Sequence, residues 1–429
     1  MSGASLRKAK FLIIFLVFMF FSSGYSFGQA SLYINQPVDK LITYEPVIKI
    51  SGKASEIGQL MVNGISIDLD RNGGFLAGLK LQPGKNYVGI SAVPTKGKKI
   101  LKTIRILRLV SFPDMDMLYE GKTHWAKKAI IDLATLGIIE GYPDNYFYPT
   151  VWISRGELAT WLCRTMGLAT KVPQRDVFYD VPKEHWRAPY IKAVVEAGGM
   201  KAFSKNLFGI SDVALRSEVT EIMRATLKIP LPKKTLQVFR DVPLTLKGAP
   251  DIYVTYVNKL VKGMSKTEKI FKPEDYVTRA QVAILFSRVP SIQKKISLLY
   301  DFNKDYSGKV LCKINTAPII EMAVVDPREI IVGEKSWITI SAKVVDKEGQ
   351  EDISRVTVDL SALGGPPDAE MFDDGTHGDG VANDKIFNLK FIAAPGVSGE
   401  KKLELKAVDK STWEGKGAVK LFVVMPIKQ

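Results

Sequence analysis

Residues 124–157 read HWAKKAIIDLATLGIIEGYPDNYFYPTVWISRGE, and the pattern of this stretch recurs further along the chain. Its Trp125 and Arg155 return 61 positions later as Trp186 and Arg216. A third, more divergent copy contains Arg279. Self-similarity at a fixed period is typical of repeated supersecondary units that bury their apolar faces against one another. The three copies are therefore predicted to form one domain.

Each copy has the pattern of two short helices. Apolar residues in 125–136 fall at helical spacing, and Gly137 follows where a helix would end on a left-handed residue. The pairs Ser154 with Glu157 and Thr278 with Gln281 have the capping-box form that begins a helix. The second copy breaks this rule because Leu215 occupies the capping position.

Three motifs of the first copy carry a family resemblance: Gly137-Ile138-Ile139, Gly141-Tyr142-Pro143-Asp144 and Ile153-Ser154-Arg155-Gly156-Glu157. In this order they resemble the S-layer homology (SLH) family, and the resemblance extends over about residues 112–290. It implies three repeats in a pseudo-threefold bundle whose grooves bind a secondary cell-wall polysaccharide or another envelope glycan. The function that this resemblance implies is non-covalent anchoring.

The candidate glycan-binding residues are three arginines and two tryptophans: Arg155, Arg216, Arg279, Trp125 and Trp186. Each arginine follows the helix cap, so its guanidinium and the free amides of the first helical turn could hold one anion. The resemblance suggests an acidic sugar such as a pyruvylated hexosamine. Alternatively, the arginines pair with carboxylates across the repeat interface. The tryptophans could stack on sugars or pack in the core.

The three grooves are predicted to differ in strength. The first copy keeps the tryptophan, the Gly-Tyr-Pro-Asp loop, the capping serine and the arginine, so Arg155 is predicted to contribute most. The second copy lacks the loop and the cap. The third lacks the tryptophan and has Gln281 where the others have an acidic residue.

The N-terminus predicts export. Three basic residues precede eleven apolar residues, 11–21, which are too few to span a bilayer about 30 Å thick. We expect a signal peptide over residues 1–30, a mature chain without a transmembrane segment, and a location at the cell surface, in the cell wall or in the periplasm. The two cysteines, Cys163 and Cys312, leave a disulfide open, and so few thiols and histidines do not support a zinc site.

The flanking regions alternate apolar and polar residues like strands. The predicted organisation is a signal peptide at 1–30, an Ig-like β-sandwich at 31–110, SLH repeats at 112–170, 176–230 and 237–290, a linker at 291–316 and a second Ig-like β-sandwich at 317–429. The predicted fold class is thus multidomain, with an all-α three-repeat SLH bundle between two all-β sandwiches.

A loop in the last region is rich in carboxylates and glycines. Its candidate calcium ligands are Asp373, Asp374, Asp379, Asn383 and Asp384. Calcium takes 6–8 oxygen ligands, which such a loop can supply, although the spacing is not that of an EF-hand. The alternative is a plain hairpin with Asx-turns. No other cofactor is predicted.

The formal net charge of +15 favours an anionic partner. Export argues against nucleic acid and for an anionic cell-envelope polysaccharide, and other envelope proteins could bind too. No catalytic motif is present and every stretch is assigned to a small domain, so we expect a structural or surface-layer protein and no enzyme. The alternatives are an accessory or scaffold component of a polysaccharide-active system and a calcium-dependent adhesin.

Overall fold

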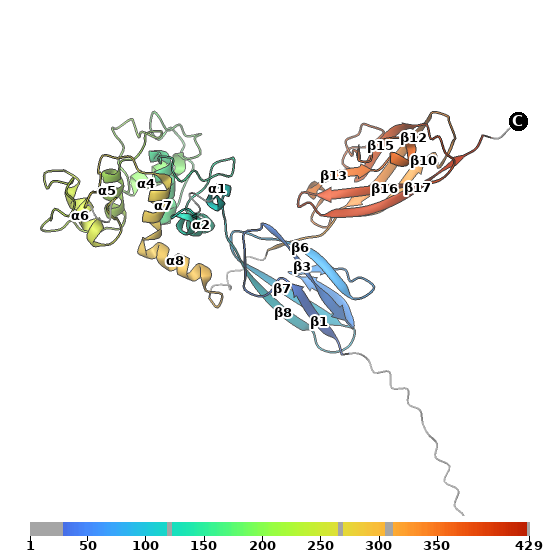
Figure 1. Cartoon of the computed structure of the whole chain (residues 1–429), viewed down its shortest axis with the longest axis horizontal. Coiled ribbons are helices and arrows are strands. Elements are labelled where there is room, and N and C mark those ends of the chain that lie inside the picture. Colours follow the sequence, from blue (N-terminus) through green and yellow to red (C-terminus); the bar gives the residue numbers. More distant parts are fainter. Residues whose placement is uncertain (1–28, 118–121, 265–268, 305–311, 427–429) are drawn as a thin grey trace, which may run out of the picture.

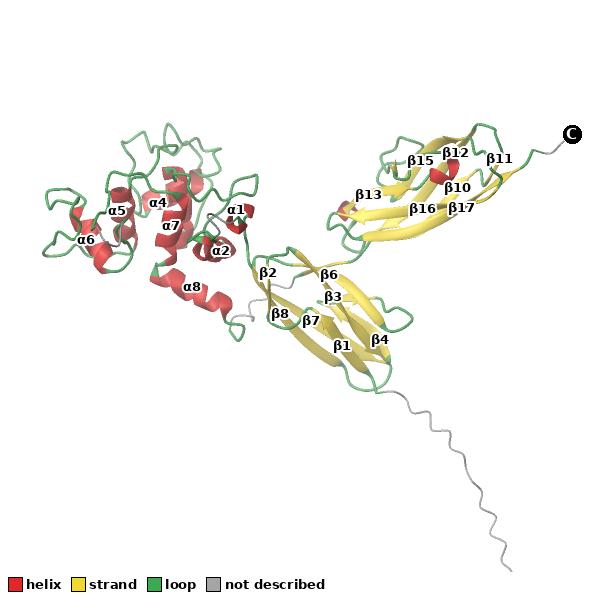
Figure 2. Cartoon of the chain, viewed as in Figure 1, coloured by secondary structure: helices red, strands yellow, loops and turns green. Residues whose placement is uncertain are grey.

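The computed structural model describes residues 29–117, 122–264, 269–304 and 312–426. The predicted signal peptide therefore lies almost wholly outside the described residues. Helices gather in one region, and strands form a region on either side of it in sequence (Figures 1 and 2). Within the described residues, no helix is both long and apolar enough to cross a membrane.

The N-terminal β region consists of two sheets. One has the order β1 (Ser31–Gln36), β3 (Val47–Ser55), β6 (Gly74–Lys80) and β9 (Lys313–Asn315). The other has the order β2 (Leu41–Thr43), β8 (Ile100–Arg108), β7 (Gly84–Pro94), β4 (Ile57–Val62) and β5 (Ile65–Ile67). Alternate residues of the long strands point inward, so Ile50, Val88 and Ile106 meet in one buried core.

The C-terminal β region has the same two-sheet plan. A three-stranded sheet contains β10 (Ile319–Asp326), β12 (Ser336–Val345) and β15 (Ile386–Ala393). The five-stranded sheet has the order β11 (Glu329–Ile331), β17 (Glu414–Val424), β16 (Gly399–Asp409), β13 (Ile353–Val358) and β14 (Ala369–Met371). Ile340 and Leu405 are among the buried residues of their shared core. Likeness of either region to immunoglobulin domains stays a prediction.

The helical region contains α1 (Pro113–Asp116), α2 (Lys127–Thr135), α3 (Arg155–Met166), α4 (Ala188–Glu196), α5 (Arg216–Thr226), α6 (Ala249–Val257), α7 (Arg279–Ser287) and α8 (Pro290–Tyr300). Three pairs pack together: α3 with α4, α5 with α6, and α7 with α2. The second helix of each copy thus packs on the first helix of the next, and the third copy returns to the first. The arrangement is a closed ring.

Backbone hydrogen bonds close the same ring at its centre. The amide of Ile153 donates to the carbonyl of Val277 (3.0 Å), Val277 donates to Ala214 (3.1 Å), and Ala214 donates to Ile153 (3.1 Å). These three residues are buried within one apolar core that also holds Trp161. Because each segment satisfies its neighbour, no copy can complete its own backbone hydrogen bonds alone.

The predicted fold class is wrong. The chain is rich in β-structure, with seventeen strands and eight helices among the described residues, and the helices α2 to α7 are only 9–12 residues long. Loops joined by isolated β-bridges, such as Ser154 with Val213, separate these helices. Asn145 and Tyr148 have positive φ values of 67° and 54°, which a right-handed helix cannot contain. The helical region is therefore not an all-α bundle.

The local signals at helix ends are confirmed. Ser154 with Glu157 and Thr278 with Gln281 both form complete capping boxes, whereas Leu215 makes no side-chain cap. Gly137 has a φ of 68° just after α2 ends. The short-range sequence pattern therefore determines where these helices begin and end.

The stretch predicted as a linker, 291–316, contains ordered elements. It includes most of α8 and the whole of β9, which pairs with β6 through partners such as Gly78 and Asn315. The chain thus returns to the N-terminal sheet after the helical region. Leu107, Ile131 and Leu299 join β8, α2 and α8 in a buried cluster.

The two cysteines are free and lie in different cores. Cys163 is buried in the helical core and Cys312 in the core of the N-terminal sheets. Burial raises the pKa of the Cys312 thiol to about 11. A disulfide between them is therefore absent from this fold, and both act as small apolar residues.

Candidate functional site

The three predicted arginines occupy equivalent places in the ring. Each is the first residue of its helix, α3, α5 or α7. The Nε of Arg155 donates to the carbonyl of Phe208 (3.1 Å), that of Arg216 to Phe271 (2.9 Å) and that of Arg279 to Phe147 (2.8 Å). In each case the guanidinium also lies within 4.5–5.0 Å of the centre of that phenylalanine ring.

Two of these arginines are closed into buried ion pairs. Arg155 pairs with Glu218 and is 2% exposed, and Arg279 pairs with Glu157 and is 1% exposed. Each also donates from Nη2 to a backbone carbonyl, of Lys201 (2.6 Å) and Glu140 (2.7 Å) respectively. A buried charge requires such partners. These two guanidinium groups therefore join one copy to the next, and their donors are not available to a ligand.

The third position differs because the acidic residue is replaced. Arg155 reaches the glutamate of the second copy and Arg279 that of the first, so the equivalent partner for Arg216 is Gln281. Arg216 forms no ion pair with any described residue, and beyond the Nε bond the other donors of its side chain have no hydrogen-bond partner there. It is half-buried, and this burial lowers the pKa of its guanidinium. A partly desolvated cation without an ion-pair partner among the described residues is left at this place, and only the more distant charges of Asp275 and Asp241 favour its charged form.

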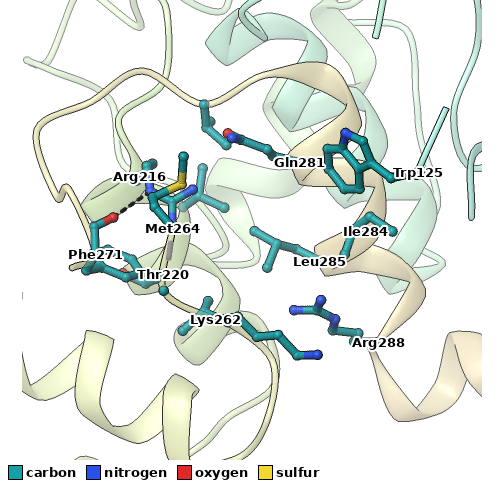
Figure 3. Close-up of a pocket in the computed structure, with 14 residues that line it drawn as sticks. Trp125, Arg216, Thr220, Lys262, Met264, Phe271, Gln281, Ile284, Leu285 and Arg288 are labelled. Atoms are coloured by element: carbon teal, nitrogen blue, oxygen red, sulfur yellow. Dashed lines mark hydrogen bonds between the residues drawn. The ribbon is translucent and has the colours of Figure 1, made fainter. Parts of the chain in front are cut away.

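A pocket of about 330 Å³ opens beside Arg216 (Figure 3). Trp125 lies across it from Arg216, Gln281 lies at its upper edge in the view, and Lys262 and Arg288 lie toward its lower edge. Thr220 and Gly263 also line it, and apolar side chains form the rest of the wall: Val219, Val261, Met264, Phe271, Val277, Ile284 and Leu285. No acidic residue is among the described residues that line it. The pocket combines an apolar wall with three cationic side chains, which suits an organic anion.

The tryptophans do not pack in the core. Trp125 is 63% exposed and Trp186 is 53% exposed. The histidine before each explains this, because its Nδ1 accepts a hydrogen bond from the amide two residues on, at 3.2 Å for His124 and 3.1 Å for His185. The His-Trp motif thus fixes a turn before the helix and leaves the indole outside. Trp125 lines the Arg216 pocket, whereas Trp186 lies 4.4 Å from the guanidinium of Arg187.

The helix amides are not available to an anion. At α5, Arg216 N donates to the carbonyl of Asp275 (3.0 Å) and Ser217 N to that of Pro273 (3.0 Å). The first amides of α3 and α7 are occupied in the same way. The first two amides of α3, α5 and α7 therefore do not join the arginine in one anion site, contrary to the sequence-based expectation.

The predicted calcium loop uses its carboxylates as hydrogen-bond acceptors. Asp373 accepts the amides of Asp384 (3.0 Å) and Lys385 (3.1 Å). Asp374 accepts from Thr376 (2.8 Å), and Asp379 accepts from Gly375 (2.7 Å). Asn383 lies in the same loop with a φ of 62°. These bonds match the alternative of a hairpin with Asx-turns, and calcium binding stays a prediction.

Elsewhere in the described chain, three acidic groups come close enough to share an ion: Asp346, Glu348 and Asp352. Their candidate ligand atoms lie within 4.8 Å of one another. Sequence spacing did not single them out, because the 3-10 turn at Gln350–Asp352 is what brings Asp352 back toward Asp346.

Several pocket residues were missed by sequence reasoning. Lys262, Arg288 and Phe271 carry no motif, and they reach Arg216 because the third copy packs on the second. One signal was present: Gln281 departs from the acidic residue of the other copies. The consequence of this substitution is visible only in the structure, where Arg155 and Arg279 each pair with the glutamate of the next copy and not with that of their own copy.

Comparison with known families gives one match. The S-layer homology domain model matches residues 121–159 and 177–220. The chain is therefore similar to S-layer homology domains over these two stretches. They include Arg155 with Glu157 and Arg216 with Glu218, whereas Arg279 lies outside them. The third copy is thus not part of the match.

Three relatives share part of this chain. An uncharacterized cell wall amidase of Bacillus anthracis is 24% identical over 52% of this chain and 42% of its own length. The surface-layer 125 kDa protein of Lysinibacillus sphaericus is 29% identical over 38% of this chain and 14% of its own length. A cellulosome-anchoring protein of Acetivibrio thermocellus is 31% identical over 30% of each. The chain spans less than half of each relative.

Proposed function

We propose that this chain is a non-enzymatic anchor that holds an exported protein to an anionic cell-envelope polysaccharide. In this proposal three SLH repeats form the binding unit at the cell surface, and the two β regions are Ig-like domains carried with it. The S-layer homology match and the surface-layer and anchoring relatives support the anchoring role. The observation that carries the choice of ligand is the unpaired Arg216 in a cationic pocket.

The ligand group is proposed to be a carboxylate or phosphate on a sugar. A planar guanidinium with free donors binds such a group in a bidentate manner, and charge-assisted hydrogen bonds are about twice as strong as neutral ones. Arg155 and Arg279 are proposed to be structural, since their donors are already used. This order reverses the sequence-based ranking, which placed Arg155 first.

The test is binding of the mature chain to polysaccharide isolated from the envelope of the producing bacterium. Arg216→Ala should lose on the order of 1.5–3 kcal/mol of binding free energy, the scale of a hydrogen bond to a charged group. Arg240→Ala is the matched control, because Arg240 is exposed, lies in the same region and does not line the pocket. Wild-type binding should also weaken as salt rises.

Calorimetry measures these affinities, and circular dichroism establishes that each variant is folded. Equal affinities for Arg216→Ala and Arg240→Ala would contradict the assignment of the pocket. If the wild-type chain does not bind the polysaccharide, the proposed anchoring function is wrong.

A further inference from the structure

We propose that the bound glycan continues past Trp125 into a second subsite, where Tyr44 and Tyr300 receive an uncharged sugar ring. This subsite lies where the helical region meets the N-terminal sheets. The inference rests on the proposed anchoring function, since it extends the same polymer beyond the Arg216 pocket.

The second subsite is a cavity of about 580 Å³. Tyr44, Trp125 and Tyr300 give it three aromatic walls, and Thr123, His124, Lys127, Lys128, Leu109 and Ile131 complete the lining. Trp125 also lines the Arg216 pocket, so one exposed indole borders both cavities. A sugar chain that leaves one cavity along this indole enters the other. Aromatic side chains with a polar tip suit the apolar face and hydroxyl rim of a sugar.

The charges of the two cavities differ. Near Tyr300, Lys127 pairs with Asp116 (2.7 Å) and Lys128 pairs with Asp132 (2.6 Å). Burial lowers the pKa of His124, which keeps that imidazole neutral near pH 7. The cations here are thus compensated, unlike Arg216. The ligand class that fits both cavities is an acidic heteropolysaccharide in which an anionic sugar adjoins an uncharged one.

The aromatic walls are held in place by the junction between the two regions. The Tyr300 hydroxyl donates to Asp132 of α2 (2.6 Å), and the Lys128 ammonium lies 4.7 Å from the Tyr300 ring. Tyr44 directly follows β2, which pairs with β8 at Ile42 and Leu107. Leu107 belongs to the cluster that joins β8 to α2 and α8. Pre-placed walls reduce the entropic cost of ordering a ligand.

Tyr44 lies outside the stretches that match the S-layer homology model. The N-terminal β region would therefore be part of the binding surface and not only a region carried by the anchor. This gives the junction between the two regions a role in recognition.

The experiment compares two ligands by calorimetry with the full mature chain: the isolated envelope polysaccharide and the anionic monosaccharide recovered from it. Tyr44→Ala should weaken polysaccharide binding about five- to tenfold and leave monosaccharide binding unchanged. Tyr44→Phe should retain wild-type affinity, because the ring remains. Tyr33→Ala is the matched control, since Tyr33 is another exposed tyrosine of the same β region and lies outside both cavities.

The outcomes separate the two proposals. If Tyr44→Ala binds the polysaccharide as well as Tyr33→Ala does while Arg216→Ala loses affinity, the second subsite is overturned and the anchoring function stands. If Tyr44→Ala weakens both ligands equally, Tyr44 acts on the first pocket and the extended path is wrong. If the wild-type chain binds neither ligand, the anchoring function fails.

Discussion

At the scale of single residues, one substitution decides what each groove does. Glu157 and Glu218 neutralise arginines that are almost fully buried, and Gln281 leaves the third arginine without a charge partner. A buried ion pair contributes little net stability, but breaking it exposes the cost of a lone buried charge. The glutamates are thus expected to be structural and the glutamine functional.

Glu157→Gln should therefore destabilise the fold strongly. It leaves the charge of Arg279, which is 1% exposed, without its counter-charge, and we expect a loss of about 3–5 kcal/mol in the free energy of unfolding. Glu184→Gln is the control, because Glu184 makes only an exposed contact of 3.8 Å with Lys183. Urea unfolding checks both. A loss below about 1 kcal/mol for Glu157→Gln would contradict the structural role of the pair.

At the scale of elements, the start of α3 is set by close contact with the second copy. A Cβ on Gly156 would lie 2.7 Å from Ile210 Cγ1 and 2.9 Å from the Ile210 carbonyl oxygen. Gly156→Ala should therefore cost about 1–3 kcal/mol through forced shifts of this loop. Gly248→Ala is the control, since its Cβ would meet only Ser217 at 3.8 Å. Thermal unfolding that ranks the two variants equally would show that the contact can relax.

Local sequence signals predicted these elements where the cause is local. The capping boxes and the glycine after α2 depend on residues three or four apart, so the sequence alone contains them. The packing of helices from different copies depends on tertiary structure, and the pair α2 with α7 depends on closure of the ring between the first and third copies. The sequence left open whether Trp125 is exposed or packs in the core, because helical spacing alone does not reveal the turn made by His124.

At the scale of the whole molecule, the chain returns on itself. β9 follows the helical region, yet it completes the sheet that begins at Ser31. Three residues, Lys313–Asn315, are too few to give a strand pattern, so sequence analysis assigned them to a linker. The two β regions then meet through Lys80 and Asp352, whose charged atoms are 2.7 Å apart. The regions are therefore in direct contact.

The carboxyl group of Asp346, which lies beside Asp352, should make the stability of the fold depend on pH. Burial, with the hydrogen bond and charge of Glu348 and the charge of Asp352, raises the pKa of Asp346 from 3.8 to about 7. Its proton is bound more tightly in the folded chain, so this contribution is full below about pH 4 and is lost as pH rises through about 7. Asp346→Asn should raise the melting temperature at pH 8 and change it much less at about pH 4. An equal change at both pH values would contradict the shifted pKa.

The central claim is that the Arg216 pocket binds an anion because Gln281 replaces the acidic partner. The most direct measurement is calorimetry of Gln281→Glu with the isolated envelope polysaccharide. A glutamate keeps the capping box with Thr278 and can pair with Arg216 as its counterparts do in the other copies. We expect a folded protein, at least as stable as the wild type, whose affinity falls at least tenfold although Arg216 is intact. Wild-type affinity in this variant would contradict it.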